Sequence, residues 1–355
     1  MVGIAVLGAG GHTGRFVVDA LRRLGATAIP ATRTGRFQPI DGAEEACRAI
    51  DFADVGSLDR AMMGADAIIN CAGPFFDTAV PAAEAALRAG IPYFDVAAEQ
   101  RTVQDLFDRL DGPARDAGVT LVPAMAFYGG LADLLASALV PSGTRAQAID
   151  IAVGLDSWHP TAGTRLTGER NTFERLVVRD GRLVPVPSPP PAEQWQFPAP
   201  FGEQPVTCVA LSEMVLLSRH IDAAEITSFM NLAPLADLHD AATPAPRAAD
   251  DRGRSAQHFV MDVRATIDGR VGRAVASGRD IYAVTAPLVV KACLTVLGGN
   301  AVPTGVRAPG EIFDPAKFLA NLAPDIMVDL DPAAIIASVR SAPDPANSQT
   351  PWSPR

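Results

Sequence analysis

The sequence predicts an α/β fold, with a doubly wound parallel sheet at the N-terminus and a second α/β domain whose sheet is mixed and partly antiparallel. Three observations support this prediction. An apolar run leads into a glycine-rich turn at residues 4–14, short apolar runs alternate with helical patterns up to residue 122, and the pattern changes near Pro123. Short apolar strands that alternate with helices are typical of a parallel sheet covered on both faces.

The first strand leads directly into the glycine-rich turn. Ile4 to Leu7 is apolar, Gly8-Ala9-Gly10-Gly11-His12-Thr13-Gly14 follows, and Arg15 to Leu24 has a helical pattern. Such a turn binds pyrophosphate, because glycines let the backbone turn tightly and the helix N-terminus supplies free N–H groups. The glycine spacing is a variant of the Rossmann fingerprint. We expect a dinucleotide site in a Rossmann domain; the alternative is an ordinary strand-to-helix turn that binds no ligand.

The second strand, Ala26 to Thr32, ends where a Rossmann protein selects its cofactor. Proteins that select NAD usually place Asp or Glu about 20 residues past the glycines. This chain has Thr32-Arg33-Thr34-Gly35-Arg36 instead, and no carboxylate before Asp41. A guanidinium matches a phosphate in shape and charge. We predict NADP(H) as the cofactor, with Arg33 as the main contact and Arg36 as the second; the alternative is two solvated loop arginines.

The alternation of strands and helices continues to residue 122, with further strands expected to end near Asp51, Gly73, Val96 and Val122. Right-handed crossovers give the doubly wound order, and ligands bind outside the carboxyl ends of the strands. The predicted cofactor site comprises Gly8, Gly10, Gly11, His12, Thr13, Gly14, Thr32, Arg33, Arg36, Asp51, Cys71, Ala72, Gly73, Pro74, Phe75, Ala97 and Glu99.

Two segments of this domain resemble a known family. Asn70-Cys71-Ala72-Gly73-Pro74-Phe75 and Tyr93-Phe94-Asp95-Val96-Ala97-Ala98-Glu99 are similar to the AGPF turn and the Tyr-x-Asp-x-x-x-Glu segment of saccharopine dehydrogenase-like oxidoreductases. The glycine-rich turn fits as well. The resemblance continues weakly in Gly278 to Ala286 and Val302 to Val306. It implies an NADP-binding oxidoreductase that acts on saccharopine, on other imines made from amines and carbonyls or, in the trans-acting enoyl reductase branch, on C=C bonds.

Composition and charge are those expected of a cytoplasmic enzyme. The 355 residues suffice for two domains, no 18-residue apolar run is present, and the start lacks a signal-peptide pattern. Four cysteines, at 47, 71, 208 and 293, stand far apart, which predicts reduced thiols and no metal site. A net charge of −10 argues against nucleic acid and anionic membranes as partners. We expect a small-molecule substrate and a homodimer, because most oligomers are symmetric dimers.

The chain changes character near Pro123. Ile149 to Leu155 and Phe259 to Ile267 are expected strands, and Asp180-Gly181 between two apolar runs predicts a hairpin. Pro185 to Pro205 is expected to be irregular because it is rich in proline. The expected organisation is a Rossmann domain over 1–125, a substrate and dimerisation domain over 126–298, a segment over 299–340 that packs back on the first domain, and a disordered tail over 341–355.

The candidate catalytic residues are Tyr128, Tyr282 and His159. In hydride transfer the protein orients the substrate and supplies a proton. Tyr128 is the first choice, because a phenol beside Gly129-Gly130 can donate a proton or polarise a carbonyl or imine; a half-buried tyrosine at the domain boundary is the alternative. Tyr282 rests on the resemblance alone, and its alternative is a core or hinge role. His159 is either an acid beside the substrate or a loop histidine that caps a strand.

The substrate is expected to contact Tyr128, Gly129 and Trp158. Arg165 or Arg170 is expected to bind a substrate carboxylate; the alternative for both is a solvated helix face. Saccharopine carries several carboxylates, and its enzymes gather basic side chains to bind them. This chain offers apolar surface instead, at Trp158, Trp195, Phe197 and Phe201. We therefore expect a weakly charged substrate from a specialised pathway.

Three functions are compatible with these residues. The first is an NADPH-dependent reductase of an imine or an activated alkene. The second is an NADP-dependent dehydrogenase that oxidises an amine or an alcohol. The third is a non-catalytic NADP-binding sensor or scaffold, which the absence of a proton donor near the nicotinamide would favour.

Overall fold

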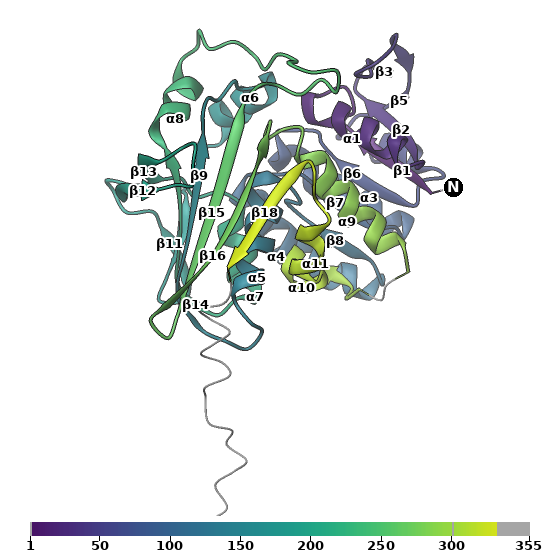
Figure 1. The fold of residues 1–355 in the computed structure, drawn as a ribbon. Coiled ribbons are helices and arrows are strands. Elements are labelled where there is room, and N and C mark those ends of the chain that lie inside the picture. Colours follow the sequence, from purple (N-terminus) through teal and green to yellow (C-terminus); the bar gives the residue numbers. More distant parts are fainter. Residues whose placement is uncertain (1, 300–301, 332–355) are drawn as a thin grey trace, which may run out of the picture.

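The chain forms two β-sheets, with helices α5, α7 and α9 lying between them (Figure 1). The structure is a computed structural model that describes residues 2–299 and 302–331. The predicted fold class, a parallel Rossmann sheet followed by a second domain with a mixed sheet, is confirmed.

The first sheet is parallel throughout, in the order β17-β8-β7-β6-β1-β2-β5. Its strands are β1 (Gly3–Leu7), β2 (Thr27–Thr32), β5 (Arg48–Ala49), β6 (Ala67–Asn70), β7 (Tyr93–Asp95), β8 (Thr120–Val122) and β17 (Gly305–Val306). Its helices are α1 (His12–Arg23), α2 (Val55–Met62), α3 (Phe75–Ala89) and α4 (Gln100–Asp116). The short strands β3 (Arg36–Phe37) and β4 (Glu45–Ala46) pair separately.

Strand β1 is the switch point of this sheet. The chain builds outward from β1 to β2 and β5, then returns to place β6, β7 and β8 on the other side of β1. All five residues of β1 are buried because the strand is central and both faces of the sheet are covered. Ligands of such sheets bind at the carboxyl ends of the strands beside this switch. The fold therefore places the glycine-rich turn at the position where a ligand is expected.

The second sheet is mixed, because β14 and β9 are parallel and its other pairs are antiparallel. Its main order is β11-β10-β14-β9-β15-β16-β18. These strands are β9 (Ala146–Leu155), β10 (Leu176–Arg179), β11 (Arg182–Pro185), β14 (Ala223–Asn231), β15 (His258–Ile267), β16 (Arg270–Arg279) and β18 (Ile326–Asp331). The hairpin predicted at Asp180-Gly181 joins β10 to β11, with positive φ at both residues.

The proline-rich stretch is not irregular, contrary to expectation. It forms a hairpin of β12 (Ala192–Gln196) and β13 (Glu203–Cys208), which pairs with β14. No proline falls within β12, and Pro205 stands where β13 pairs with β12 alone. Burial of Trp195 against the sheet stabilises the hairpin.

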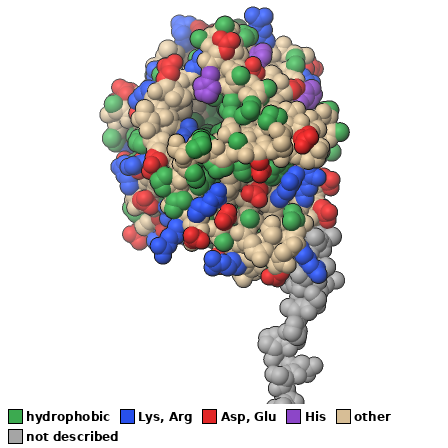
Figure 2. All heavy atoms as spheres, turned by 90° about the vertical axis from the view of Figure 1, so that its left-hand side faces the viewer, with side chains coloured by type: hydrophobic (Ala, Val, Ile, Leu, Met, Phe, Trp, Pro, Cys, Tyr) green, Lys and Arg blue, Asp and Glu red, His purple; other side chains and the backbone are tan. Residues whose placement is uncertain are grey.

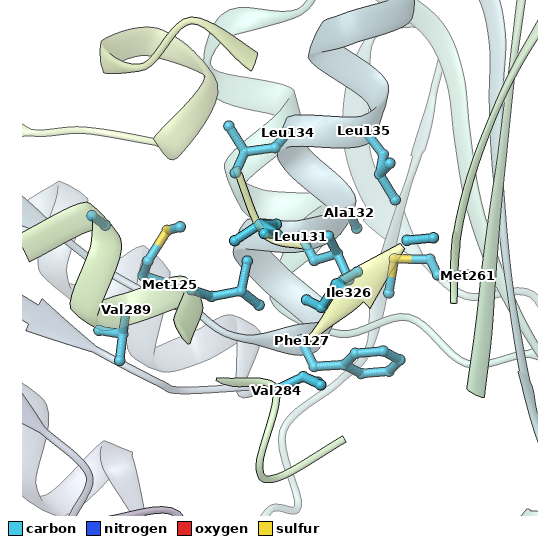
Figure 3. Close-up of a cluster of buried hydrophobic side chains, with 14 of the residues drawn as sticks. Met125, Phe127, Leu131, Ala132, Leu134, Leu135, Met261, Val284, Val289 and Ile326 are labelled. Atoms are coloured by element: carbon cyan, nitrogen blue, oxygen red, sulfur yellow. The ribbon is translucent and has the colours of Figure 1, made fainter. Parts of the chain in front are cut away.

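The helices that follow residue 126 pack on both sheets. They are a π-helical turn η1 (Phe127–Leu131), α5 (Ala132–Leu139), α6 (Ala162–Arg170), α7 (Glu213–His220), α8 (Leu232–His239), α9 (Thr285–Leu297), α10 (Pro309–Ile312) and α11 (Pro315–Ala320). Figure 3 shows the core where these elements meet. Met125, Phe127 and Leu131 pack there with Met261 from β15, Val289 from α9 and Ile326 from β18. This packing fixes η1, and with it the backbone of Tyr128.

The C-terminal segment contributes to both sheets. Strand β17 pairs with β8 of the first sheet, and β18 pairs with β16 of the second. The domain boundaries expected from sequence stay a prediction, and the expected tail at 341–355 lies outside the described residues. Among the described helices, none has the length and apolarity that crossing a membrane requires. Figure 2 shows acidic and basic side chains interspersed over the face that carries the second sheet.

Candidate active site

The turn after β1 is packed tightly against its neighbours. Gly8 has a φ of 72°, a conformation that favours glycine, and its N–H donates to the Ala31 carbonyl over 2.9 Å. A Cβ atom on Gly8 would lie 2.7 Å from the backbone N of Ala72, and one on Gly14 would lie 2.9 Å from Ala9 Cα. Only glycine fits at these two positions, and the turn brings the end of β1 against the end of β6.

Helix α1 begins at this turn with unpaired donors. Gly11 precedes the helix and provides no side-chain cap, so the N–H groups of His12, Thr13 and Gly14 lack intrahelical acceptors. Gly10 and Gly11 are exposed at the crest of the turn, where a ligand can approach the backbone. The free donors and the positive end of the helix dipole fit a diphosphate.

His12 carries an unsatisfied polar atom beside these donors. Its Nε2 is buried and has no hydrogen-bond partner within the described residues. The ring packs edge-to-face on Phe16 and on Tyr282, with a centroid distance of 5.3 Å in each case. Burial lowers the pKa of His12, although the nearby Asp280 charge opposes this. The imidazole is therefore neutral at pH 7 and has one nitrogen available to a ligand.

The residues that follow β2 and β5 have different surroundings. Arg33 is exposed, and its side chain is not held by an ion pair or hydrogen bond within the described ranges. Arg36 Nη1 lies 2.5 Å from Glu44 Oε1, and this hydrogen bond raises the pKa of Arg36. Thr32 donates to the Arg36 carbonyl over 2.9 Å, and Asp51 accepts the Ala53 N–H over 2.9 Å. Arg33 is thus available to a phosphate, whereas Arg36 must first leave Glu44.

The turn from Cys71 to Phe75 is held by a buried acid. Glu99, whose side chain is 2% exposed, accepts the Phe75 N–H over 3.1 Å and the Ala98 N–H over 2.9 Å. Burial raises the pKa of Glu99, and the two N–H groups oppose this shift. Burial also raises the pKa of the Cys71 thiol, which therefore stays protonated. These contacts position the Ala72-Gly73-Pro74 backbone at the crevice beside Gly8.

Asp95 is a buried acid that sequence reasoning did not single out. Its carboxylate accepts hydrogen bonds from Tyr93 Oη over 2.9 Å, from Ala97 N over 3.0 Å and from Ala124 N over 2.7 Å. Burial raises the pKa of Asp95 to about 6, against the effect of these donors. Asp95 ties the ends of β7 and β8 together. Asp95 is part of the Tyr-x-Asp-x-x-x-Glu segment, but nothing in the sequence shows that three hydrogen-bond donors converge on its carboxylate.

The hydroxyl of Tyr282 has no free hydrogen-bonding capacity. It accepts from Trp158 Nε1 over 2.9 Å and from the Thr161 N–H over 3.4 Å, and it lies 3.0 Å from Thr164 Oγ1. Because Trp158 and the amide can only donate, the phenol proton is directed to Thr164. Burial raises the pKa of Tyr282. Its hydroxyl therefore has no proton left to offer a substrate in this arrangement.

Tyr128 differs from Tyr282 in this respect. Its hydroxyl is buried and has no hydrogen-bond partner in the part of the chain that the structure describes. Its ring lies 6.1 Å from the Trp158 ring and 5.0 Å from the Phe127 ring, centroid to centroid. Burial raises the pKa of Tyr128 well above its ordinary value, with a further contribution from the Tyr282 and Glu213 charges. The phenol keeps its proton and has a free donor.

Glu213 is a second buried acid that the sequence did not single out. It is 2% exposed at the start of α7, and its Oε1 accepts the Leu211 N–H over 2.9 Å. Burial raises the pKa of Glu213 to about 7, although hydrogen bonds and the Arg175 charge lower it. A Cβ on Gly129 would lie 2.9 Å from Ser212 Oγ, so η1 packs directly on the start of α7. In sequence, a serine and a glutamate before an apolar helix indicate only a helix start.

Helix α6 lies over the turn from Cys71 to Phe75 and contacts the start of α3. Arg170 pairs with Asp77 of α3 over 2.6 and 3.2 Å, and its guanidinium lies 4.9 Å from the Phe76 ring centroid. Arg165 donates to the carbonyls of Leu238, Asp240 and Thr243. Both guanidinium groups already have partners in this structure, and the expectation that either arginine binds a substrate carboxylate stays a prediction.

The remaining aromatic and histidine candidates lie in different surroundings, some next to Tyr128 and others in a separate apolar cluster. Trp158 is 7% exposed and its ring lies next to that of Tyr128; the contact of both with a substrate stays a prediction. Trp195 and Phe197 are at most 2% exposed and belong to a separate apolar cluster under the β12–β13 hairpin. The expectation that these two side chains offer surface to a substrate is wrong. His159 is partly buried after Trp158, and no hydrogen bond holds its ring within the described residues.

A cavity of about 260 Å³ lies beside the first turn of α1. It is lined by His12, Arg15, Phe16, Ile40, Asp41, Pro246, Ala248, Asp250, Asp251 and Gly253. Residues 246–253, which lie in the segment between α8 and β15, cover the start of α1 here (Figure 1). In the described ranges, three or more metal-ligating side chains do not come together. The expected lack of a metal, the homodimer and the cytoplasmic location all stay predictions.

The first part of the chain is similar to a known domain family. Residues 4–122 match the family model described as the saccharopine dehydrogenase NADP binding domain. A sequence comparison with curated proteins found no match. Apo saccharopine dehydrogenase (L-Glu forming) from Saccharomyces cerevisiae is similar in structure, with a TM-score of 0.59 and 15% identity over 93% of this chain and 100% of that one. DAP dehydrogenase from C. glutamicum gives a TM-score of 0.46 and 12% identity over 91% and 96%. The likeness to the yeast enzyme shows the fold alone.

Proposed function

We propose that this chain is an NADPH-dependent reductase of the saccharopine dehydrogenase-like type, because residues 4–122 match the saccharopine dehydrogenase NADP binding domain. The proposed reaction is hydride transfer to a C=N or activated C=C bond of a small, weakly charged metabolite of a specialised pathway. The observation that carries this proposal is the buried hydroxyl of Tyr128, which lacks a partner in the described residues and belongs to a ring next to that of Trp158.

The cofactor contacts are proposed from the crevice around β1. The N–H groups of His12, Thr13 and Gly14, which lack acceptors within the helix, and the Nε2 of His12, which has no partner within the described residues, would bind the diphosphate. Arg33 would bind the 2′-phosphate, with Arg36 released from Glu44 as a second contact. The backbone of residues 71–75, held by Glu99, would line the nicotinamide side. When bound, NADPH supplies the hydride.

Tyr128 is proposed as the proton donor. A reduced C=N or C=C bond needs one proton in addition to the hydride, and a protonated phenol within reach of the acceptor atom can supply it. Tyr282 is less suited to this task, because two donors and Thr164 already occupy its hydroxyl. Burial raises the pKa of the Tyr128 phenol, and the charge of Glu213 adds to this effect.

The substrate is proposed to be weakly charged because the two arginines of α6, Arg165 and Arg170, already have partners. Arg170 is bound to Asp77, and Arg165 is bound to carbonyl groups. Apolar and aromatic surface remains at Trp158 and Tyr128. Such a wall suits a ring or an alkyl chain better than a dicarboxylate.

The test is product analysis with deuterated cofactor. The protein is incubated with NADPH that carries deuterium at C4 of the nicotinamide, together with a panel of cyclic imines, amine–carbonyl mixtures and α,β-unsaturated thioesters. The proposal expects deuterium at the reduced carbon of at least one class, and NADPH rather than NADH as the donor. Turnover only in the reverse sense, with NADP⁺ and an amine or alcohol, would replace the proposal by a dehydrogenase.

A further inference from the structure

Tyr282 stands where the two halves of the site meet. It follows β16 in a sharp turn at Asp280, which has a φ of 61° and is fully buried. The Asp280 carboxylate accepts the N–H groups of Tyr282 and Ala283 over 3.0 Å each, and that of Ser255 over 2.7 Å. The strained turn is thus fixed by its own hydrogen bonds, and it presents the Tyr282 side chain in one direction.

The two ends of the Tyr282 side chain contact different parts of the site. Its ring packs on His12 of the phosphate-binding turn, with the planes at 86°. Its hydroxyl is bonded to Trp158 and to Thr161 and Thr164 at the start of α6. A rigid phenol therefore spans the distance between the nucleotide loop and the substrate wall.

Helix α6 depends on such polar contacts for its position. It has no buried residue, so apolar packing contributes little to holding it in place. Thr167 Oγ1 would lie 3.6 Å from a Cβ on Gly73, which puts α6 over the turn from Cys71 to Phe75. Other contacts of α6 are the half-exposed Arg170–Asp77 pair, the Arg170 guanidinium on the Phe76 ring and the bonds of Arg165.

We propose that Tyr282 is a positioning residue that couples nucleotide binding at His12 to the closed position of α6 over the substrate site. This rests on the proposed function, since the nucleotide is the ligand expected at His12. A phosphate there gives the unpaired Nε2 an acceptor and so fixes the imidazole ring. The fixed ring holds the Tyr282 phenol, and the phenol holds Thr161, Thr164 and Trp158. Coupling of this kind is reciprocal, so a closed α6 also favours the bound nucleotide.

The test measures amide hydrogen exchange in residues 161–170 with and without saturating NADPH, for the wild type and Tyr282→Phe. The phenylalanine variant keeps the ring contact with His12 and loses all three hydroxyl contacts. Tyr128→Phe is the matched control, because it removes a tyrosine hydroxyl that has no partner in the described residues. Thr164→Val is a second variant, which removes a single contact of the Tyr282 hydroxyl. NADPH affinity is measured on each protein by fluorescence titration.

We expect NADPH to slow exchange in α6 by about tenfold in the wild type and in Tyr128→Phe, a factor on the scale of one net hydrogen bond. The slowing is lost in Tyr282→Phe and reduced in Thr164→Val, while both variants still bind NADPH. Equal slowing in the wild type, Tyr282→Phe and Thr164→Val would overturn the coupling. So would a wild type that binds NADPH with no change in α6, although the proposed function would then stand. A wild type that does not bind NADPH would overturn both.

Discussion

Replacing Glu213 by glutamine should make the protein more stable at alkaline pH. The buried carboxyl has its pKa raised from its ordinary value of 4.5 to about 7, chiefly by burial. Between these two pH values the folded protein keeps a proton on Glu213 that the unfolded chain has lost. The stability of the wild type therefore falls as pH rises through this range, and it stays lower above pH 7.

The size of the effect follows from the shift in pKa. Each unit is worth 1.36 kcal/mol, so a shift from 4.5 to about 7 corresponds to about 3 kcal/mol at pH 8. Glutamine keeps an oxygen that can accept the Leu211 N–H, and it has no charge to bury. The variant should have a stability close to that of the wild type at pH 4.5 and exceed it by about 3 kcal/mol at pH 8.

The assay is urea unfolding followed by circular dichroism at several pH values from 4.5 to 8. Glu203→Gln is the matched control, because it makes the same chemical change at an exposed position; its curve should run parallel to that of the wild type. A stability difference between Glu213→Gln and the wild type that stays constant over this range would refute the reasoning. Glu213 would then be ionised in the folded protein, and Tyr128 would face a permanent negative charge.

Three further substitutions test other parts of the site. Gly14→Ala should abolish binding of both NADPH and NADH in a fluorescence titration, because the new Cβ would lie 2.9 Å from Ala9 Cα; retained binding would show that the turn can relax. Tyr128→Phe should lower kcat by about 10²-fold with the substrate that the deuterium screen identifies, while the Kd for NADPH stays unchanged. An unchanged kcat would exclude Tyr128 as the proton donor. Arg170→Ala should cost less than about 1 kcal/mol in urea unfolding, because its pair with Asp77 is half-exposed, and a larger loss would mean that α6 supports the fold.

The first domain was predictable because its signals are local. A buried parallel strand reads as a continuous apolar run, and the glycine spacing reflects contacts within one turn. Gly8 and Gly14 are required because the backbone of residues 9 and 72 comes within 3 Å of their missing Cβ positions. The sequence indicated Arg33 and Arg36 as candidate phosphate contacts. It did not indicate that Arg36 is paired with Glu44, because this contact forms across a small hairpin that the sequence did not predict.

The second domain was harder to predict because its site is assembled from distant segments. The β12–β13 hairpin forms in a proline-rich stretch because Trp195 finds a buried surface on the sheet, which is a tertiary effect. Glu213 acquires its raised pKa because η1 and α7 pack together, and sequence shows neither contact nor burial. Tyr282 was singled out as a catalytic candidate, but the sequence does not show that Trp158, Thr161 and Thr164 converge on its hydroxyl, which is why we propose a positioning role for it.

The measurement that tests the central claim most directly is a titration of the protein with NADPH and with NADH, on the wild type and on Arg33→Ala. The account predicts that the wild type binds NADPH at least tenfold more tightly than NADH. It also predicts that Arg33→Ala loses about 10- to 100-fold in affinity for NADPH alone, the range expected for one charged hydrogen-bonding group. Equal affinity of the wild type for the two nucleotides, or binding of neither, would contradict the assignment of the crevice beside β1 as an NADP(H) site.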